Sequence, residues 1–390
     1  MYPNSQFCVH GVFVHEQNRE LMNLCEIKVI SPVPWSPIPI RWLKKKWRQY
    51  ASIPYRNQID GIEVYYPRYL ALPKGYLFEY SGWFYYRGIR NSVKKIYKKF
   101  KFDVIHAHVA LPDGYGAMLV NRFYGKPLIV NVHGLDIFYT VKKNHKCTRA
   151  IREVFRKADR IVTVSNKLAK KVSLYCKDLQ KIKIINNGIA SERIFQGESR
   201  IKQKYEKKKI LLSVGDLIKR KGIDYVIRAF PQVLKKIPNL VYLVIGKGSE
   251  EKNLKRLTKE LLLENYIIFL GQQPYQKVME YMSICDLFVL PSWNEGFGVV
   301  YLEAMAHNKP VIGSMREGIE DVIHNGENGL VVRPKDVNSL RETILRVLEN
   351  PEFGKQIGQR AGKLVREKFT WQKNAERVYG IYSELISENA

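Results

Sequence analysis

Short apolar runs alternate with helical patterns along most of the chain. In the first half, four mainly apolar runs each end in polar residues or glycine, as buried strands of a parallel sheet do. Stretches with helical periodicity fall between them, at 149–158 and 166–175. The predicted strands are FDVIHAH (102–108), PLIVNVHG (127–134), RIVTVS (160–165) and KIKIINNG (181–188).

The same alternation starts again after residue 205. The segment NGENG (325–329) predicts a hairpin turn, and three helices are expected to close the chain, at 336–348, 351–368 and 372–388. The other predicted helices lie near 222–236, 249–263, 275–283 and 298–307. The predicted strands are KKILLSVGD (208–216), LVYLVIGKG (240–248), YIIFLG (266–271), LFVLPS (287–292) and KPVIGS (309–314).

Repeated strand–helix–strand alternation predicts an α/β protein with doubly wound parallel sheets. Because the pattern occurs twice, we expect two Rossmann-like domains, at 1–190 and 205–370. Residues 371–390 are expected to form a helix that packs back on the first domain. Ligands of such sheets bind beyond the carboxyl ends of the strands. We therefore expect the site in a cleft between the two domains.

The amino-terminal segment departs from this pattern. Residues 1–24 begin with turn residues and continue into a helix, and the strand CEIKVISP (25–32) comes only afterwards. The first strand of a doubly wound sheet is normally central. The pattern therefore indicates that the first strand of the amino-terminal domain is missing, and that the chain starts downstream of its natural start.

Composition agrees with a folded protein and limits its chemistry. A chain of 390 residues with 45% hydrophobic residues is long enough for two domains with cores of their own. No run of about twenty apolar residues and no signal-peptide pattern is present. The odd number of cysteines, with no Cys-x-x-Cys, favours a reduced compartment over a zinc site or disulfide framework. The cysteines are at positions 8, 25, 147, 176 and 285.

The formal net charge of +28 is concentrated in the first half, where residues 1–200 hold 35 Lys and Arg against 14 Asp and Glu. Such an excess favours an anionic partner. The regions 35–56 and 75–102 combine aromatic residues with cations, a pattern typical of proteins that dock on anionic membranes. A lysine-rich composition of solvated faces, with ordinary packing aromatics, is the alternative. No nucleic-acid recognition motif is present.

The most informative motif is PSWNEGFGVVYLEAMAHNKPVIGS (291–314). Glu295 follows a predicted strand, and three residues, Gly296 to Gly298, open the helix that carries Glu303. Amides at a helix amino terminus bind anions, and glycine lets a diphosphate approach the backbone. Acidic residues beside such a site accept hydrogen bonds from a ribose diol. Two carboxylates around an anion site suit a ligand with hydroxyls at both ends, a nucleoside diphosphate sugar.

This motif resembles the signature of the retaining GT-B glycosyltransferases of family four. Further similar segments are HAHVALPDGYGA, VNVHGLDIF, NNGI, SVGDLIKRKG and NGENGLVV, and within the family the chain is most similar to bacterial enzymes of teichuronic-acid and other cell-surface polysaccharide assembly. The resemblance implies that Glu295, with the amides of Gly296, Phe297 and Gly298, binds the donor sugar and that Glu303 holds the ribose. It implies that Lys221 neutralises the diphosphate, and that His133 lies beside the transferred sugar with Asp136 close by.

Some positions depart from the family pattern. Asp216 stands where an arginine is usual, so that Lys219 or Arg220 is a candidate replacement, and Arg316 and Glu317 replace a glycine pair. His106 and His108 are interpreted as mainly structural, with an acceptor-side role as the alternative. No Asp-x-Asp is present, and the resemblance implies transfer with retention and no metal.

The expected partners are a nucleotide-sugar donor, a polyprenyl-diphosphate-linked glycan as acceptor and an anionic membrane surface, with no nucleic acid. The expected location is the cytoplasmic face of the cell membrane. The alternatives are a transferase acting on a soluble small molecule, and a catalytically impaired protein that only binds sugar nucleotides. An NAD oxidoreductase would need Gly-x-Gly-x-x-Gly after a strand, and GKGSEE (246–251) lacks the third glycine.

Overall fold

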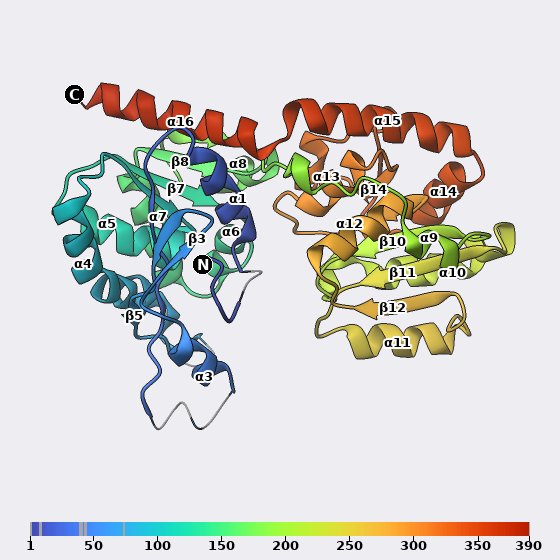
Figure 1. The fold of residues 1–390 in the computed structure, drawn as a ribbon, viewed down its shortest axis with the longest axis horizontal. Coiled ribbons are helices and arrows are strands. Elements are labelled where there is room, and N and C mark those ends of the chain that lie inside the picture. Colours follow the sequence, from blue (N-terminus) through green and yellow to red (C-terminus); the bar gives the residue numbers. More distant parts are fainter. Residues whose placement is uncertain (1, 8–9, 39–41, 43–44, 73–74, 390) are drawn as a thin grey trace. The chain divides into compact units, whose positions relative to one another are not determined.

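The computed structural model describes residues 2–7, 10–38, 42, 45–72 and 75–389, and Figure 1 shows its elements. The chain divides into two compact units. The first comprises the residues up to Asn186 together with those from Trp371 onward, and the second is Asn187–Thr370.

The second unit is a doubly wound sheet of six parallel strands in the order β12-β11-β10-β13-β14-β15. Numbered along this unit, the order is 3-2-1-4-5-6, which places the switch point of the sheet between β10 and β13. The strands are β10 (Lys209–Val214), β11 (Leu240–Ile245), β12 (Ile267–Gly271), β13 (Leu287–Val289), β14 (Val311–Ser314) and β15 (Leu330–Val332). The helices are α9 (Arg200–Lys204), α10 (Ile223–Lys236), α11 (Glu251–Glu260), α12 (Tyr275–Ile284), α13 (Val299–Ala306), α14 (Val337–Leu348) and α15 (Pro351–Lys368).

The hairpin predicted at NGENG is wrong. The segment does turn, with Gly326 at a φ of 84°, but β15 runs parallel to β14. The chain between these strands forms the short helix Gly318–Asp321. It returns to the other end of the sheet along this connection, before it reaches the turn. The turn signal was therefore correct, and the strand direction inferred from it was not.

The first unit is built on the parallel sheet β6-β7-β8-β9, whose two faces are both covered. Leu128, Val130 and Val132 of β7 pack into one core cluster with α5 and α7. Ile129, on the opposite face, packs with α16, which runs along the sheet in Figure 1. The strands are β6 (Ile105–His108), β7 (Leu128–Val132), β8 (Arg160–Thr163) and β9 (Ile182–Ile184). The helices are α4 (Ser81–Lys99), α5 (Tyr115–Asn121), α6 (Leu135–Phe138), α7 (His145–Lys157), α8 (Asn166–Val172) and α16 (Trp371–Glu388).

The remaining strands of this unit belong to two smaller sheets. In one, of order β1-β4-β3, β1 and β4 are parallel, and β3 and β4 form an antiparallel hairpin. The other pairs β2 with β5. As predicted, no strand precedes α1 in the described part of the chain. The elements are α1 (Val12–Leu21), α3 (Lys45–Ser52), β1 (Lys28–Ile30), β2 (Val33–Pro34), β3 (Arg56–Ile59), β4 (Ile62–Tyr65) and β5 (Arg68–Tyr69).

Candidate functional site

The motif residues of the second unit meet where the sheet switches direction. Lys221 lies in the loop after β10, and Glu295 in the loop after β13, its neighbour in the sheet. Gly222 joins the first loop to α10 at a φ of 70°, and a Cβ there would lie 2.4 Å from the carbonyl oxygen of Pro291. Only glycine combines this backbone conformation with this contact. The two loops are therefore held against each other at the place where doubly wound sheets bind ligands.

Glu295 is the negatively charged partner in a buried ion pair. Lys221 Nζ lies 2.6 Å from Glu295 Oε2, and an Arg220 guanidinium nitrogen lies 3.4 Å from the same oxygen. Burial alone would raise the pKa of Glu295, but these two cations outweigh it and hold that pKa below its usual value. Glu295 is thus a fixed negative charge beside two positive ones. Lys219 pairs with Asp224 instead, at 2.6 Å.

The Gly-Phe-Gly segment opens helix α13, as the sequence predicts. Gly298 precedes the helix at a φ of 89°, and a Cβ at this position would lie 2.6 Å from the Tyr301 ring. The Phe297 side chain is buried in the core. Because the Phe297 side chain is buried, only the backbone amide of Phe297 can bind a ligand. The amides at the start of α13 carry the partial positive charge of a helix amino terminus.

Glu303 lies further along the same helix and is partly buried. Burial raises its pKa to about 7, and a hydrogen bond with Tyr275 opposes this rise. Around neutral pH this carboxyl is thus close to half ionised in the structure. A group poised in this way can accept hydrogen bonds from a diol once it is ionised.

Two contacts beside these glutamates, made by His307 and Glu317, were not expected from the sequence. His307 Nδ1 donates to the Glu303 carbonyl at 2.7 Å, and its Nε2 accepts from the Phe195 amide at 3.0 Å. Burial lowers the pKa of His307, which favours the neutral tautomer that both hydrogen bonds require. Its spacing, four residues after Glu303, was the available signal.

Glu317 holds the loop that carries Glu295. Its Oε2 accepts a 2.9 Å hydrogen bond from the Glu295 amide. Arg316, one of the two residues that stand in place of a glycine pair, has a φ of 59°, in the region that favours glycine. The substituted pair therefore keeps a glycine-like turn and adds a carboxylate that anchors the neighbouring loop. Asp216, the other departure, is exposed.

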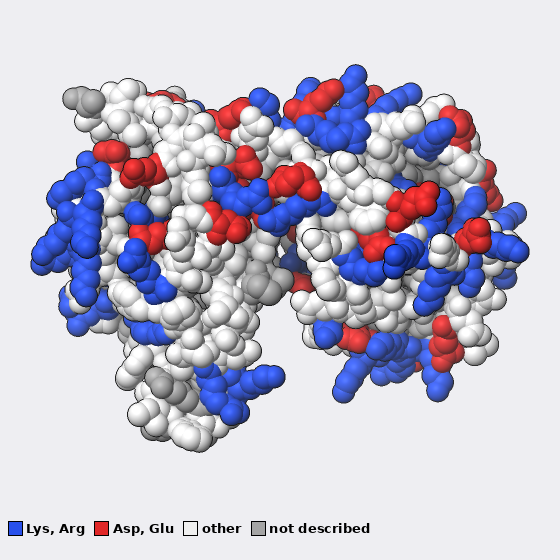
Figure 2. Space-filling model, viewed as in Figure 1, with Lys and Arg blue, Asp and Glu red and all other residues white. Residues whose placement is uncertain are grey.

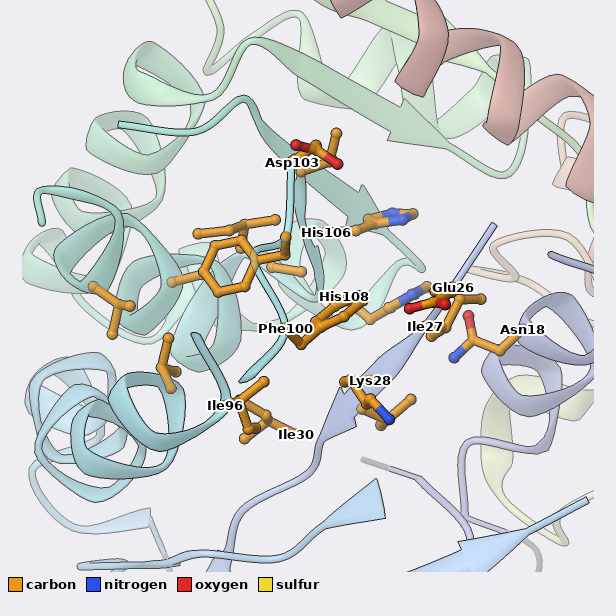
Figure 3. Close-up of a pocket in the computed structure, with 18 of the residues that line it drawn as sticks. Asn18, Glu26, Ile27, Lys28, Ile30, Ile96, Phe100, Asp103, His106 and His108 are labelled. Atoms are coloured by element: carbon orange, nitrogen blue, oxygen red, sulfur yellow. The ribbon is translucent and has the colours of Figure 1, made fainter. Parts of the chain in front are cut away.

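The predicted histidine of the first unit belongs to a stack of three imidazoles. His133 Nε2 lies 3.1 Å from His108 Nδ1, and His106 stacks on His108 with ring centroids 4.6 Å apart. Burial lowers the pKa of His133 to about 3 and that of His106 to about 4. The stack is therefore neutral at physiological pH. His106 is further fixed by Asn131 and by Tyr382 of α16, at 2.8 and 2.6 Å. His106 and His108 line the cavity of about 710 Å³ that Figure 3 shows.

Asp136 lies three residues after His133, in α6, and is fully buried. Its Oδ2 accepts a hydrogen bond from the Ala110 amide at 3.2 Å, while Oδ1 has no partner among the described residues. Burial raises the pKa of this carboxyl to about 7. In the structure Asp136 anchors the loop after β6, and its role toward a donor stays a prediction.

Comparison with family models gives two matches that together span most of the chain. The model described as Glycosyltransferase Family 4 matches residues 11–193. The model described as Glycosyl transferases group 1 matches residues 195–364, which hold Lys221, Glu295 and Glu303.

Two curated relatives show the extent of the similarity. A Bacillus subtilis protein named as the teichuronic acid biosynthesis glycosyltransferase TuaC is 30% identical, over 99% of this chain and 97% of its own length. The N-acetyl-alpha-D-glucosaminyl L-malate synthase of Bacillus anthracis is 27% identical, over 77% of this chain and 80% of its own.

Solved structures share the fold. Sucrose-phosphate synthase from Thermosynechococcus elongatus superposes with a TM-score of 0.80 at 20% identity, covering 97% of this chain and 93% of that one. Anabaena HepE, solved with UDP and glucose, superposes with a TM-score of 0.73 at 19% identity, covering 96% and 95%. With its two Rossmann-like units and its similarity to TuaC along nearly the whole length, the chain belongs to the group 1 glycosyltransferases and has the GT-B fold.

Proposed function

We propose that this chain transfers a sugar from a nucleoside diphosphate sugar to a hydroxyl of a lipid-linked glycan during assembly of a cell-surface polysaccharide. Transfer proceeds with retention and without a metal ion. The observation that carries the proposal is the grouping of Lys221, Glu295 and the amides before α13 at the switch point of the second unit. This grouping offers positive charge to a diphosphate and a fixed carboxylate to hydroxyls.

In the proposed reaction, negative charge develops on the leaving diphosphate, and preorganised cations and amides lower the barrier most where that charge appears. Lys221 and the helix amides take this role. Glu295 binds hydroxyls of the donor sugar, and Glu303 binds the ribose. His133 lies beside the transferred sugar as a neutral hydrogen-bonding group. The donor phosphate takes the acceptor proton in a front-face displacement.

The test of the function combines binding with turnover. The chain is expected to gain thermal stability with UDP or another nucleoside diphosphate in a panel of nucleotides and nucleotide sugars. It should release that nucleotide from its sugar when a polyprenyl-diphosphate glycan is added, and EDTA should not change the rate. Loss of activity in EDTA with recovery in manganese would contradict metal independence. Binding without any transfer would favour the non-catalytic alternative.

A soluble acceptor is the second candidate, because one relative is named an L-malate synthase. That name includes L-malate, a small acid. The strongly basic first half of this chain would also attract a small acid. Transfer to small hydroxy acids in the same assay, with none to the lipid-linked glycan, would select this candidate.

Replacing Glu303 by Gln is expected to weaken UDP binding about tenfold or more, because a hydrogen bond to a charged group is worth about 1.5–3 kcal/mol. The effect should vanish for 2′,3′-dideoxy-UDP, which lacks the diol. Calorimetry of both ligands with both proteins measures this, with the exposed Glu264→Gln as the matched control. An equal loss for both ligands would remove Glu303 from the ribose.

The same variant tests the raised pKa of Glu303. A carboxyl whose folded pKa is about 7, against an ordinary value of 4.5, binds its proton more tightly in the folded state. It therefore destabilises the fold as pH rises from about 4.5 to 7, by at most about 3 kcal/mol. Glu303→Gln should melt at a higher temperature than the parent at pH 8, and this gain should shrink at pH 5.

The proposed membrane surface lies in the first unit, where Figure 2 shows Lys and Arg gathered over α4 and near α3. Helix α4 buries Ile89, Val93 and Ile96 and exposes its lysines at 94, 95, 98 and 99. In the first turn of the same helix, the Trp83 side chain remains 47% exposed. An exposed Trp and exposed Lys on one helix suit the interface of an anionic bilayer. Among the described residues, no helix is both long and apolar enough to span a bilayer.

This surface predicts flotation with vesicles that contain phosphatidylglycerol, at about 150 mM salt, and not with neutral vesicles. Each lysine near an anionic surface contributes about 1 kcal/mol. Reversing Lys94 and Lys98 to Glu should therefore lower the vesicle affinity about 30-fold or more. The matched control reverses Lys252 and Lys259, exposed lysines of the second unit. A parent chain that stays at the bottom of the gradient defeats the idea.

A further inference from the structure

Two cations at the switch point of the second unit share one carboxylate. Lys221 Nζ lies 2.6 Å from Glu295 Oε2, and an Arg220 guanidinium nitrogen lies 3.4 Å from the same oxygen. The side chains of Lys221 and Glu295 are only 11% and 14% exposed. Lys219, the third cation of this loop, pairs with Asp224 at 2.6 Å. Each cation of the loop therefore already has a carboxylate partner.

The backbone on both sides of this ion pair is held in place. The Glu295 amide donates to Glu317 Oε2 at 2.9 Å. A Cβ at Gly318 would lie 2.0 Å from the carbonyl oxygen of Gly296, so the turn after β14 packs directly on the loop that carries the glutamate. The loop of the cations packs on the same loop at Gly222. Because the loops are fixed in this way, any anion that reaches the cations also meets the carboxylate.

Glu295 keeps its negative charge in the neutral range. Burial raises its pKa, but the charge of Lys221 and the hydrogen bond from it lower that pKa more strongly. Arg220 and a backbone hydrogen bond from Gly296 act in the same direction, and the pKa lies below its usual value. An anion that binds Lys221 must therefore share the ammonium with a carboxylate and is repelled by it.

A diphosphate that carries a sugar and one that does not differ in how they meet this carboxylate. Sugar hydroxyls can donate to it, and hydrogen bonds to an ionised group are among the stronger ones in proteins. A free nucleoside diphosphate has no hydroxyl beyond its β-phosphate. Its terminal phosphate loses a second proton at about pH 6, which adds about one negative charge. The free nucleotide thus gains less at the carboxylate and is repelled more.

We propose that Glu295 competes with the diphosphate for Lys221, and that hydroxyls of the transferred sugar relieve this competition. Glu295 is then a specificity-determining residue, which shifts the preference of the site from the free nucleotide toward the sugar-bearing donor. The inference rests on the proposed function, which places Lys221 at the diphosphate and Glu295 at the sugar. It adds that the ion pair between them opposes binding of the nucleotide product and so speeds its release.

The test measures nucleotide affinity by calorimetry in the full chain, for the parent and for Glu295→Gln. The amide keeps the shape of the side chain and removes its charge. UDP should bind about tenfold more tightly to the variant, with most of the gain in slower dissociation. The second ligand is whichever of UDP-glucose, UDP-galactose and UDP-N-acetylglucosamine the parent binds most tightly. This sugar nucleotide should bind the variant no more tightly than the parent, or more weakly.

Two further variants complete the test. Glu295→Ala, which removes the whole carboxylate, should show the same gain for UDP, so the result does not depend on the folding of one variant. Glu264→Gln removes one exposed carboxylate of the same unit and should bind both ligands as the parent does.

Opposite changes for the two ligands support the proposal. An equal gain for UDP and for the sugar nucleotide indicates general repulsion and overturns it. Unchanged or weaker UDP binding in both Glu295 variants also overturns it. Lys221→Met distinguishes this failure from failure of the proposed function. If Lys221→Met weakens UDP binding while the Glu295 variants bring no gain, only the competition is overturned. Equal UDP binding in the parent and all these variants overturns the proposed diphosphate site as well.

Discussion

Replacing Lys221 by Met is expected to lower the affinity for UDP about 10²-fold and to slow transfer at least as much. In the structure this ammonium lies 2.6 Å from Glu295 Oε2, and its side chain is 11% exposed. Its removal takes away a charge-assisted contact to the proposed diphosphate. It also leaves the Glu295 carboxylate with only the more distant of its two cations, Arg220 at 3.4 Å, among the described residues, so that an incoming anion meets a poorly neutralised negative charge.

The same substitution should destabilise the protein at neutral pH. Removing one partner of a buried ion pair costs about 3–5 kcal/mol when the other charge is left without compensation, and Arg220 reduces this cost. The pKa of Glu295 is held below its ordinary 4.5, so the stability that the pair contributes is present above about pH 4.5 and lost as pH falls further. The gap in melting temperature between parent and Lys221→Met should narrow below that pH.

Lys236→Met provides the matched control, because Lys236 is an exposed lysine of the neighbouring helix α10. It should keep the UDP affinity and the melting temperature of the parent. Calorimetry at two salt concentrations separates the loss of UDP affinity from the loss of stability, because the contact with the diphosphate is the more sensitive to screening by salt. Unchanged UDP affinity in Lys221→Met would remove the lysine from the diphosphate and, with it, the main support for the proposed donor site.

Periodicity alone predicted most of the second unit. Helix α13, expected near 298–307, runs from Val299 to Ala306, and the glycine signal at its start is a local one. The small strands β3 and β4 were missed. The residues of β3, Arg-Asn-Gln-Ile, are mostly polar and exposed, and the strand pairs at the edge of its sheet, where burial leaves no alternating pattern for sequence reasoning to detect.

Residues of the candidate site could be predicted where their position depends on their own backbone or on a short spacing within one motif. They were harder to predict where their position depends on a contact with a residue distant in the sequence. Gly298 and Glu303 follow from one motif. The pairing of Lys221 with Glu295 joins residues 74 positions apart, and only the strand order of the sheet places their loops side by side. Glu317 acts on the Glu295 amide from a third loop, and no local pattern marks that contact.

Replacing His133 by Ala is expected to reduce turnover about 10²-fold or more while UDP affinity stays within about twofold. The reason is the place beside the transferred sugar that the proposed function gives to His133. His133 belongs to the first unit, where its Nε2 lies 3.1 Å from His108 Nδ1. The centroid of its ring lies 4.6 Å from that of the Phe13 ring. A preorganised hydrogen-bonding group beside the reacting sugar acts mainly in the transition state, and losing one such group typically costs about 10²–10³ in rate.

The pH profile distinguishes this role from that of a titrating acid or base. Burial lowers the pKa of His133 to about 3, so the imidazole is neutral throughout pH 5–8 and should contribute no inflection to the turnover profile there. His145→Ala, at an exposed histidine of the same unit, should turn over like the parent. Full turnover in His133→Ala would dismiss the residue from the reaction. An inflection near pH 6.5 that disappears in this variant would show that His133 titrates in the working enzyme, which would contradict the neutral role argued from its burial.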